Sequence, residues 1–138
     1  MKNLNRALSL LLLSATLFFT SCTKDQNENF QSTTKEFISA GKWSVDYYFA
    51  GSDKTLQFSN YQFVFTGNGT LTGTDGNNEF SGTWKTLRDV NRNDVLQITI
   101  NSQDPGLTGL NLPWNVTAKS SLVISMKEGS DELRFKKL

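Results

Sequence analysis

Aromatic and polar residues alternate most clearly at residues 61–84, where the sequence reads YQFVFTGNGTLTGTDGNNEFSGTW. Tyr61, Phe63 and Phe65 would share one face of an extended segment, and the residues between them would share the other. A period of two is typical of a half-buried β-strand and excludes a helix. With two clusters of glycine and asparagine between apolar positions, the pattern predicts three short strands joined by two tight turns.

The two turns can be tested against the hydrophobic pattern. A three-residue loop at residues 67–69 places Phe63 opposite Gly73, and a two-residue turn at residues 76–77 places Phe80 opposite the same glycine. A one-residue change in either loop would turn inward residues outward. Inward aromatic rings facing inward glycines predict a strongly curved sheet.

The same alternation extends along the rest of the chain. A first strand follows Gly41, a fifth covers residues 95–101, and three more follow residue 112. A three-residue loop at residues 118–120 would set Trp114 opposite Ile124. The connections at residues 51–60 and 102–111 are expected to be irregular loops, the second a candidate lid. Capping-box spacing predicts a short helix at Thr33 before the first strand.

Eight strands joined mostly by hairpins predict an all-β fold, an antiparallel up-and-down meander barrel. A two-sheet sandwich is the competing architecture, but its crossings need longer connections. An eight-stranded barrel either packs its interior with side chains or holds one small ligand, and both alternatives stay open. The residues expected to face inward, as ligand lining or as core, are Trp43, Tyr47, Phe63, Phe65, Phe80, Trp84, Ile98, Ile100, Trp114 and Ile124.

The N-terminus has the pattern of a signal peptide. Lys2 and Arg6 precede an apolar run at residues 7–19, which is too short to span a membrane comfortably, and small residues then precede Cys22. We therefore expect residues 1–21 to be a lipoprotein signal peptide. Residues 22–40 would hold an acylated cysteine, a flexible tether and the short helix, and residues 41–138 the barrel.

The residues before Cys22 resemble a bacterial lipobox, in which the cysteine is acylated by fatty acids such as palmitate and becomes the mature N-terminus. The polar, charged segment at residues 23–28 is similar to the leader of Bacteroidota lipoproteins. This resemblance implies an outer membrane lipoprotein that faces the periplasm or the cell surface. The membrane would then be a partner through Cys22.

Gly41, Lys42 and Trp43 at the head of the first strand resemble the Gly-x-Trp signature of lipocalins and other calycins. The whole domain is similar to the lipocalin-like domains of Bacteroidota lipoproteins. The resemblance implies a ligand-binding barrel, one end of which is closed by Trp43 with a basic residue of the last strand lying across it. Arg134 is the residue with the right order in the chain.

Charge and composition restrict the chemistry. The formal net charge is +1 and no basic stripe stands out, which argues against a nucleic-acid partner. Without histidine the chain lacks the commonest general base and metal ligand, and one cysteine cannot form an internal disulfide. Residues 89–93 resemble half of a calcium loop, but Asp94 replaces the required glycine and Ile100 the bidentate glutamate. We expect no catalysis, no metal and no cofactor.

Two functional interpretations follow. The first is a membrane-anchored, non-catalytic lipocalin-like lipoprotein that binds a small hydrophobic ligand inside the barrel. The alternative is a filled barrel that binds another envelope protein through its loops and tether, as a subunit of an envelope complex or as a protease inhibitor. Whether the interior is hollow decides between them.

Overall fold

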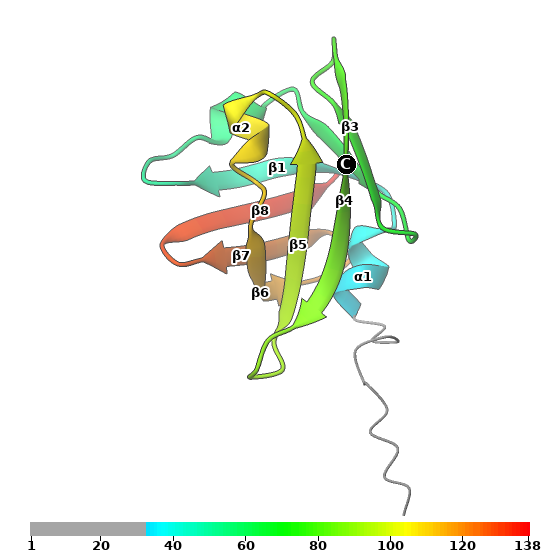
Figure 1. Ribbon diagram of the computed structural model, residues 1–138, viewed down its shortest axis with the longest axis vertical. Helices are drawn as coiled ribbons and strands as arrows, with labels where there is room; N and C mark the ends of the chain where they lie inside the picture. Colours follow the sequence, from blue (N-terminus) through cyan, green and yellow to red (C-terminus); the bar gives the residue numbers. More distant parts are fainter. Residues whose placement is uncertain (1–32) are drawn as a thin grey trace, which may run out of the picture.

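Figure 1 shows the computed structural model, which describes residues 33–138 of the chain. The strands close into one antiparallel barrel in the order of the sequence, from β1 to β8 and back to β1, which confirms the predicted eight-stranded meander with a short helix before its first strand. The expected signal peptide, Cys22 and the tether lie outside the described residues. The elements are α1 (Thr33–Ile38), β1 (Lys42–Phe49), η1 (Thr55–Phe58), β2 (Gln62–Phe65), β3 (Thr70–Thr74), β4 (Glu79–Arg88), β5 (Asp94–Asn101), α2 (Pro105–Thr108), β6 (Pro113–Lys119), β7 (Val123–Glu128) and β8 (Asp131–Lys137).

The curvature of the barrel depends on two glycines. Phe63 pairs with Gly73 and Gly73 pairs with Phe80, which confirms the register predicted from the turns. A Cβ atom on Gly73 would collide with the Phe80 ring, and one on Gly82 would collide with the carbonyl oxygen of Thr99. Both positions therefore require glycine because another strand or ring approaches their backbone closely.

Two stretches of strand edge are covered by the chain itself. Only two residue pairs join β1 to β2, and beyond them the next loop takes over: the Lys54 amide donates to the Tyr48 carbonyl over 2.8 Å. At the far end of β5 the Asn111 side chain accepts from the Ile100 amide (2.6 Å) and donates to the Ile100 carbonyl (3.1 Å). These bonds stand in for a neighbouring strand, so the edges are not open to another chain.

A β-bulge changes which residues of β1 face the interior of the barrel. The pairing of β1 with β8 shifts by one residue between Val45 and Tyr47, after which Tyr48, not Tyr47, is buried. One extra residue reverses the alternation for the remainder of a strand. The expectation that Tyr47 faces the interior is therefore wrong, although the alternation holds for Trp43 and Val45.

A second bulge makes the pairing of β6 with β7 differ from the predicted hairpin. The register shifts between Val116 and Ala118, β6 continues to Lys119, and Ile124 pairs with Lys119, not with Trp114 as predicted. The turn therefore lies at residues 120–122, later than the expected 118–120. Leu122 consequently points to solvent.

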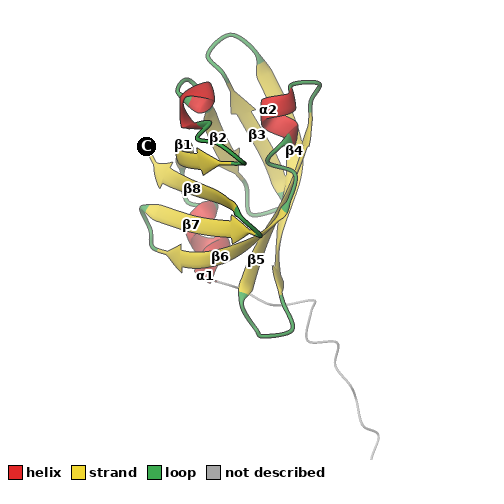
Figure 2. Cartoon of the chain, turned by 90° about the vertical axis from the view of Figure 1, so that its left-hand side faces the viewer, coloured by secondary structure: helices red, strands yellow, loops and turns green. Residues whose placement is uncertain are grey.

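Helical segments close both ends of the barrel, and Figure 2 shows α1 at the end opposite to α2. At one end Ile38 is buried and its carbonyl accepts a 2.7 Å hydrogen bond from the Trp43 indole. At the other end η1 and α2 bury Phe58, Leu107 and Leu110 in the core. The segment 102–111 was expected to be an irregular lid, but it contains a helix that plugs the barrel.

Candidate functional site

The centre of the barrel is an aromatic cluster. The Phe135 ring lies 5.3 Å from that of Phe63 and 5.5 Å from that of Phe65, and Phe65 meets Trp84 edge-on at 5.7 Å. Phe63 also contacts Phe80 at 5.4 Å. Phe135 was absent from the predicted interior set, although its alternation with Leu133 along β8 carried the signal. Edge-to-face contacts at these distances are typical of a packed aromatic core.

Most of the predicted interior set is buried in this core. The buried members are Trp43, Phe63, Phe65, Trp84, Ile98, Ile100, Trp114 and Ile124. Phe80 is half-buried, and Tyr47 lies outside the core. Among the described residues every buried side-chain nitrogen and oxygen has a hydrogen-bond partner, so none is left aimed at an unfilled space. These side chains pack on one another, and whether any of them contacts a ligand stays a prediction.

The expected closure of the barrel by Arg134 is wrong. Its guanidinium lies on the outer face, where Nε donates to the Asp46 carboxylate over 2.6 Å and the group stacks 5.6 Å from the centre of the Tyr47 ring. The bulge in β1 places Tyr47 beside Arg134 on that face. Trp43 is covered by α1 and its flanking residues instead.

A groove of about 570 Å³ crosses the outer face of β2, β3 and β4. Its floor is a cross-strand row in which Val64 pairs with Thr72, Thr72 with Ser81 and Ser81 with Asn101. Hydroxyl and amide groups dominate the lining, while half-buried Val64 adds an apolar contact. The lining residues are Lys42, Gln62, Val64, Thr72, Gly73, Thr74, Glu79, Phe80, Ser81 and Asn101. No pattern in the sequence indicates this groove, because outward polar residues of a strand look alike whether the surface is flat or hollow.

The carboxylates of Asp75 and Asp89 accept hydrogen bonds from residues of their own turns. Hydrogen bonds from Asn78 and Asn77 lower the pKa of Asp75, and bonds from Asn93 and Asn91 lower the pKa of Asp89 in the same way. Such Asx hydrogen bonds fix the local backbone. Within residues 33–138 no group of three or more acidic, cysteine or histidine side chains is placed to hold a metal ion.

Asp104 joins α2 to the start of β2. One carboxylate oxygen accepts from the Gly106 amide at the start of the helix, over 2.8 Å, and the other accepts from the Tyr61 hydroxyl over 2.7 Å. This hydrogen bond is the main cause that raises the pKa of Tyr61 to about 12. A second tyrosine, Tyr48, donates to the Gly109 carbonyl over 3.1 Å. The plug at residues 102–111 is therefore bound to the barrel wall.

Asp94, which stands where a calcium loop would need glycine, is a buried carboxylate at the start of β5. It accepts from the Thr34 hydroxyl over 2.6 Å and pairs with the Lys119 ammonium. The three groups come from α1, β5 and β6, so Asp94 ties the N-terminal helix to the barrel. Asp94 lies 60 positions after Thr34 in the sequence, and no local pattern predicts their contact.

Comparison with known proteins tests the fold. No protein-family model matches the chain, and no curated protein matches it. A crystal structure of a lipocalin-like protein from Bacteroides uniformis matches with a TM-score of 0.53 and 15% identity, covering 73% of this chain and 99% of that one. The fold is lipocalin-like. A DUF4847 family protein from Bacteroides vulgatus also matches, with a TM-score of 0.55 and 16% identity, over 75% of this chain and 96% of that one.

The lipocalin-like barrel of this chain agrees with the resemblance carried by its Gly41 to Trp43 signature. At such low identity the likeness shows the shared fold and nothing of ligand or partner. No helix within residues 33–138 is both long and apolar enough to cross a membrane.

Proposed function

We propose that this chain is a lipid-anchored, non-catalytic binding protein of the outer membrane, whose barrel is filled and which binds an envelope protein on its outer surface. The observation that carries the proposal is the packed interior, closed by α1 at one end and by η1 and α2 at the other. Acylation of Cys22 would supply the anchor, on the periplasmic side or at the cell surface.

A ligand inside this barrel would have to displace core side chains. Phe63, Phe65 and Phe135 have no exposed surface, and each contacts at least two other rings. Removing such a ring from its contacts costs about 3–5 kcal/mol, which a small apolar molecule would have to repay before it bound at all. The interior therefore favours a structural role for the aromatic cluster over the binding of a hydrophobic ligand.

The outer groove offers the chemistry of a binding surface. Thr72 and Ser81 lie side by side on its floor and can each donate and accept a hydrogen bond, while Val64 beside Thr72 offers an apolar side chain. Lys42 and Glu79 add one charge of each sign to the lining. A mixture of hydroxyl and amide groups with one apolar contact suits a polar segment of a protein partner.

Site-specific photocrosslinking tests this proposal in the cell that makes the protein. A photoreactive phenylalanine analogue replaces the exposed Thr72 in the groove, and in a matched control it replaces Thr117, which is exposed on β6 outside the groove. We expect one discrete protein adduct from position 72 and none from position 117. Identical adducts at both positions, or none at position 72, would argue against binding in the groove.

A further inference from the structure

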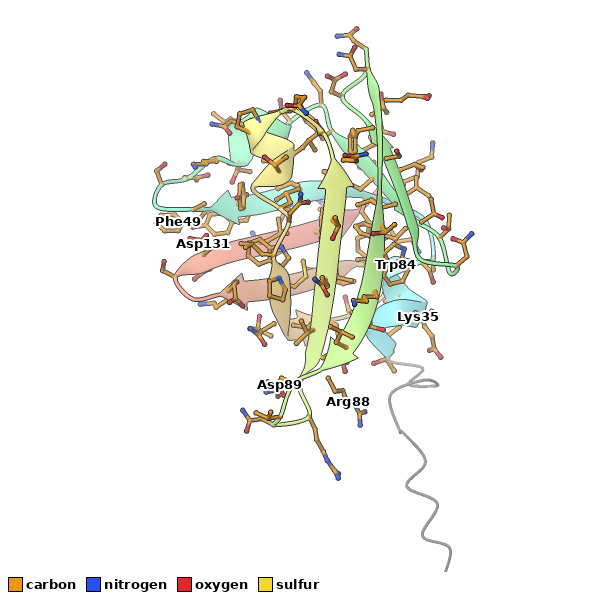
Figure 3. The ribbon with its side chains drawn as sticks, in the orientation of Figure 1. Lys35, Phe49, Trp84, Arg88, Asp89 and Asp131 are labelled. Atoms are coloured by element: carbon orange, nitrogen blue, oxygen red, sulfur yellow. The ribbon has the colours of Figure 1, made fainter. Side chains whose placement is uncertain are left out.

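The two ends of the barrel differ in charge. In an up-and-down barrel alternate connections lie at the same end, so α1 shares an end with the turns after β2, β4 and β6, which we call the α1 end. The opposite end carries η1, α2 and the turns after β3 and β7, and we call it the α2 end. Figure 3 shows Lys35 and Arg88 in the lower part of the molecule and Asp131 at its left side.

Basic residues dominate the α1 end. Its charged residues are Lys35, Lys42, Arg88, Arg92, Lys119, Lys136 and Lys137 against Glu36, Asp89 and Asp94. Acidic residues dominate the α2 end, where Asp53, Asp75, Glu79, Asp104, Glu128, Asp131 and Glu132 face only Lys54 and Lys127. With no histidine in the chain, this separation of charge persists throughout the neutral pH range.

The α1 end also exposes apolar side chains beside its basic residues. Val90, at the tip of the β4–β5 hairpin between Arg88 and Arg92, is 98% exposed, and Leu122 in the β6–β7 turn is 64% exposed. Asp89 holds the hairpin in shape by accepting from the Asn93 amide over 2.7 Å. A hydrogen-bonded tip with one apolar residue between two arginines is suited to the headgroup region of a bilayer. Apolar side chains and cationic groups are both stabilised there.

The chain enters the barrel at this same end. Ten residues separate Cys22 from Thr33, the first residue of α1. A fully extended connection of that length spans at most about 40 Å. With Cys22 held in the bilayer, as the proposed function requires, the first residue of the α1 end lies within that distance of the lipid.

We propose that the α1 end docks on the anionic lipid surface of the membrane that holds the anchor, with Val90 at the headgroup level and the acidic α2 end directed away. This inference rests on the proposed lipid anchor but not on the groove or its partner. Lys35, Arg88 and Arg92 attract the negative surface, and each basic residue near such a surface contributes a separate increment of binding. The docking fixes the orientation of the barrel.

Quenching by brominated lipid measures that orientation in the full acylated protein. The native tryptophans are buried, so Val90→Trp introduces an exposed indole at the α1 end and Leu56→Trp, at a position 87% exposed on η1, introduces its matched control at the α2 end. Each variant is placed in vesicles of phosphatidylcholine, with or without brominated phosphatidylglycerol. Native emission of the buried tryptophans verifies folding in both.

We expect the indole at position 90 to lose most of its emission in brominated anionic vesicles and the one at position 56 to keep it. Adding Arg92→Asn to Val90→Trp should shift the docking equilibrium about fivefold toward the undocked state, and asparagine suits the left-handed φ of 66° at this position. The proposal would be overturned by equal quenching at both positions, by quenching at position 56 alone, or by no quenching of the anchored protein. The third outcome would indicate that a protein, and not lipid, covers the α1 end. Failure of the protein to float with vesicles would instead reject the lipid anchor.

Discussion

Replacing Phe135 with alanine tests whether the barrel is a solid core. The phenylalanine has no exposed surface and lies between the rings of Phe63 and Phe65. Loss of its transfer free energy costs about 2 kcal/mol. A hole of roughly 100 Å³ adds about 2.4 kcal/mol at 24 cal/mol per Å³. Phe135→Ala should therefore lower the free energy of unfolding by about 4 kcal/mol and Tm by about 15 to 30 °C.

Thermal and urea unfolding measure this loss, with Leu122→Ala as the matched control. Leu122 is 64% exposed, so its truncation should change the free energy of unfolding by less than about 0.5 kcal/mol. Benzene supplies a second readout, because an apolar cavity of about 150 Å³ binds it, the hole left by the ring of Phe135 approaches that size, and the binding raises Tm. We expect benzene to raise the Tm of Phe135→Ala and to leave the unmodified protein unchanged.

A hollow barrel would give different results in both measurements. In that case benzene would raise the Tm of the unmodified protein. Phe135→Ala would then cost less than about 1 kcal/mol, since a side chain that lines an open cavity has fewer contacts to lose.

Three further predictions follow from single contacts. The Tyr61 hydroxyl donates to Asp104 and its pKa is raised to about 12, so the stability that it contributes should be complete below pH 10 and disappear between pH 10 and 12. Ultraviolet titration of Tyr61→Phe should lose one late phenolate ionisation and keep that of Tyr48, whose pKa is also raised by burial. Gly82→Ala should destabilise the fold by about 1–3 kcal/mol in urea unfolding, because a Cβ would meet the facing strand, whereas Gly67→Ala, with nothing within 4 Å, should have little effect. Asp94→Asn should cost about 2–3 kcal/mol by stranding a lysine ammonium that is partly solvated, and an unchanged Tm would contradict this.

The repeat of two and the glycine pairs were enough to predict the barrel. Once the loop lengths were chosen so that rings face glycines, the pairing of Phe63 with Gly73 and of Gly73 with Phe80 followed directly. Local rules fix a hairpin because its two strands are neighbours in sequence. The strand count, the meander and the short first helix therefore needed no long-range information.

The remaining features depend on contacts that local patterns do not encode. A bulge such as the one after Val45 adds a residue to the strand without a recognisable change in composition. The sequence therefore does not indicate that Tyr48, and not Tyr47, faces the interior. In the sequence, the segment that contains Leu107 and Leu110 looks like a glycine-rich loop. Its role as a plug follows only from the burial of these two leucines at the end of the barrel. The groove and the separation of charge between the two ends arise only when distant turns meet in space.

Native mass spectrometry of the protein from its own membrane shows whether the barrel is filled or holds a ligand. The acylated protein is extracted gently and compared with a soluble form that begins at Thr23, so that lipid bound to the anchor is distinguished from a ligand inside the barrel. A filled barrel predicts that the soluble form has the mass of its polypeptide alone. A stoichiometric extra mass retained by the soluble form, and lost when the barrel unfolds, would contradict the account and show a ligand in the interior.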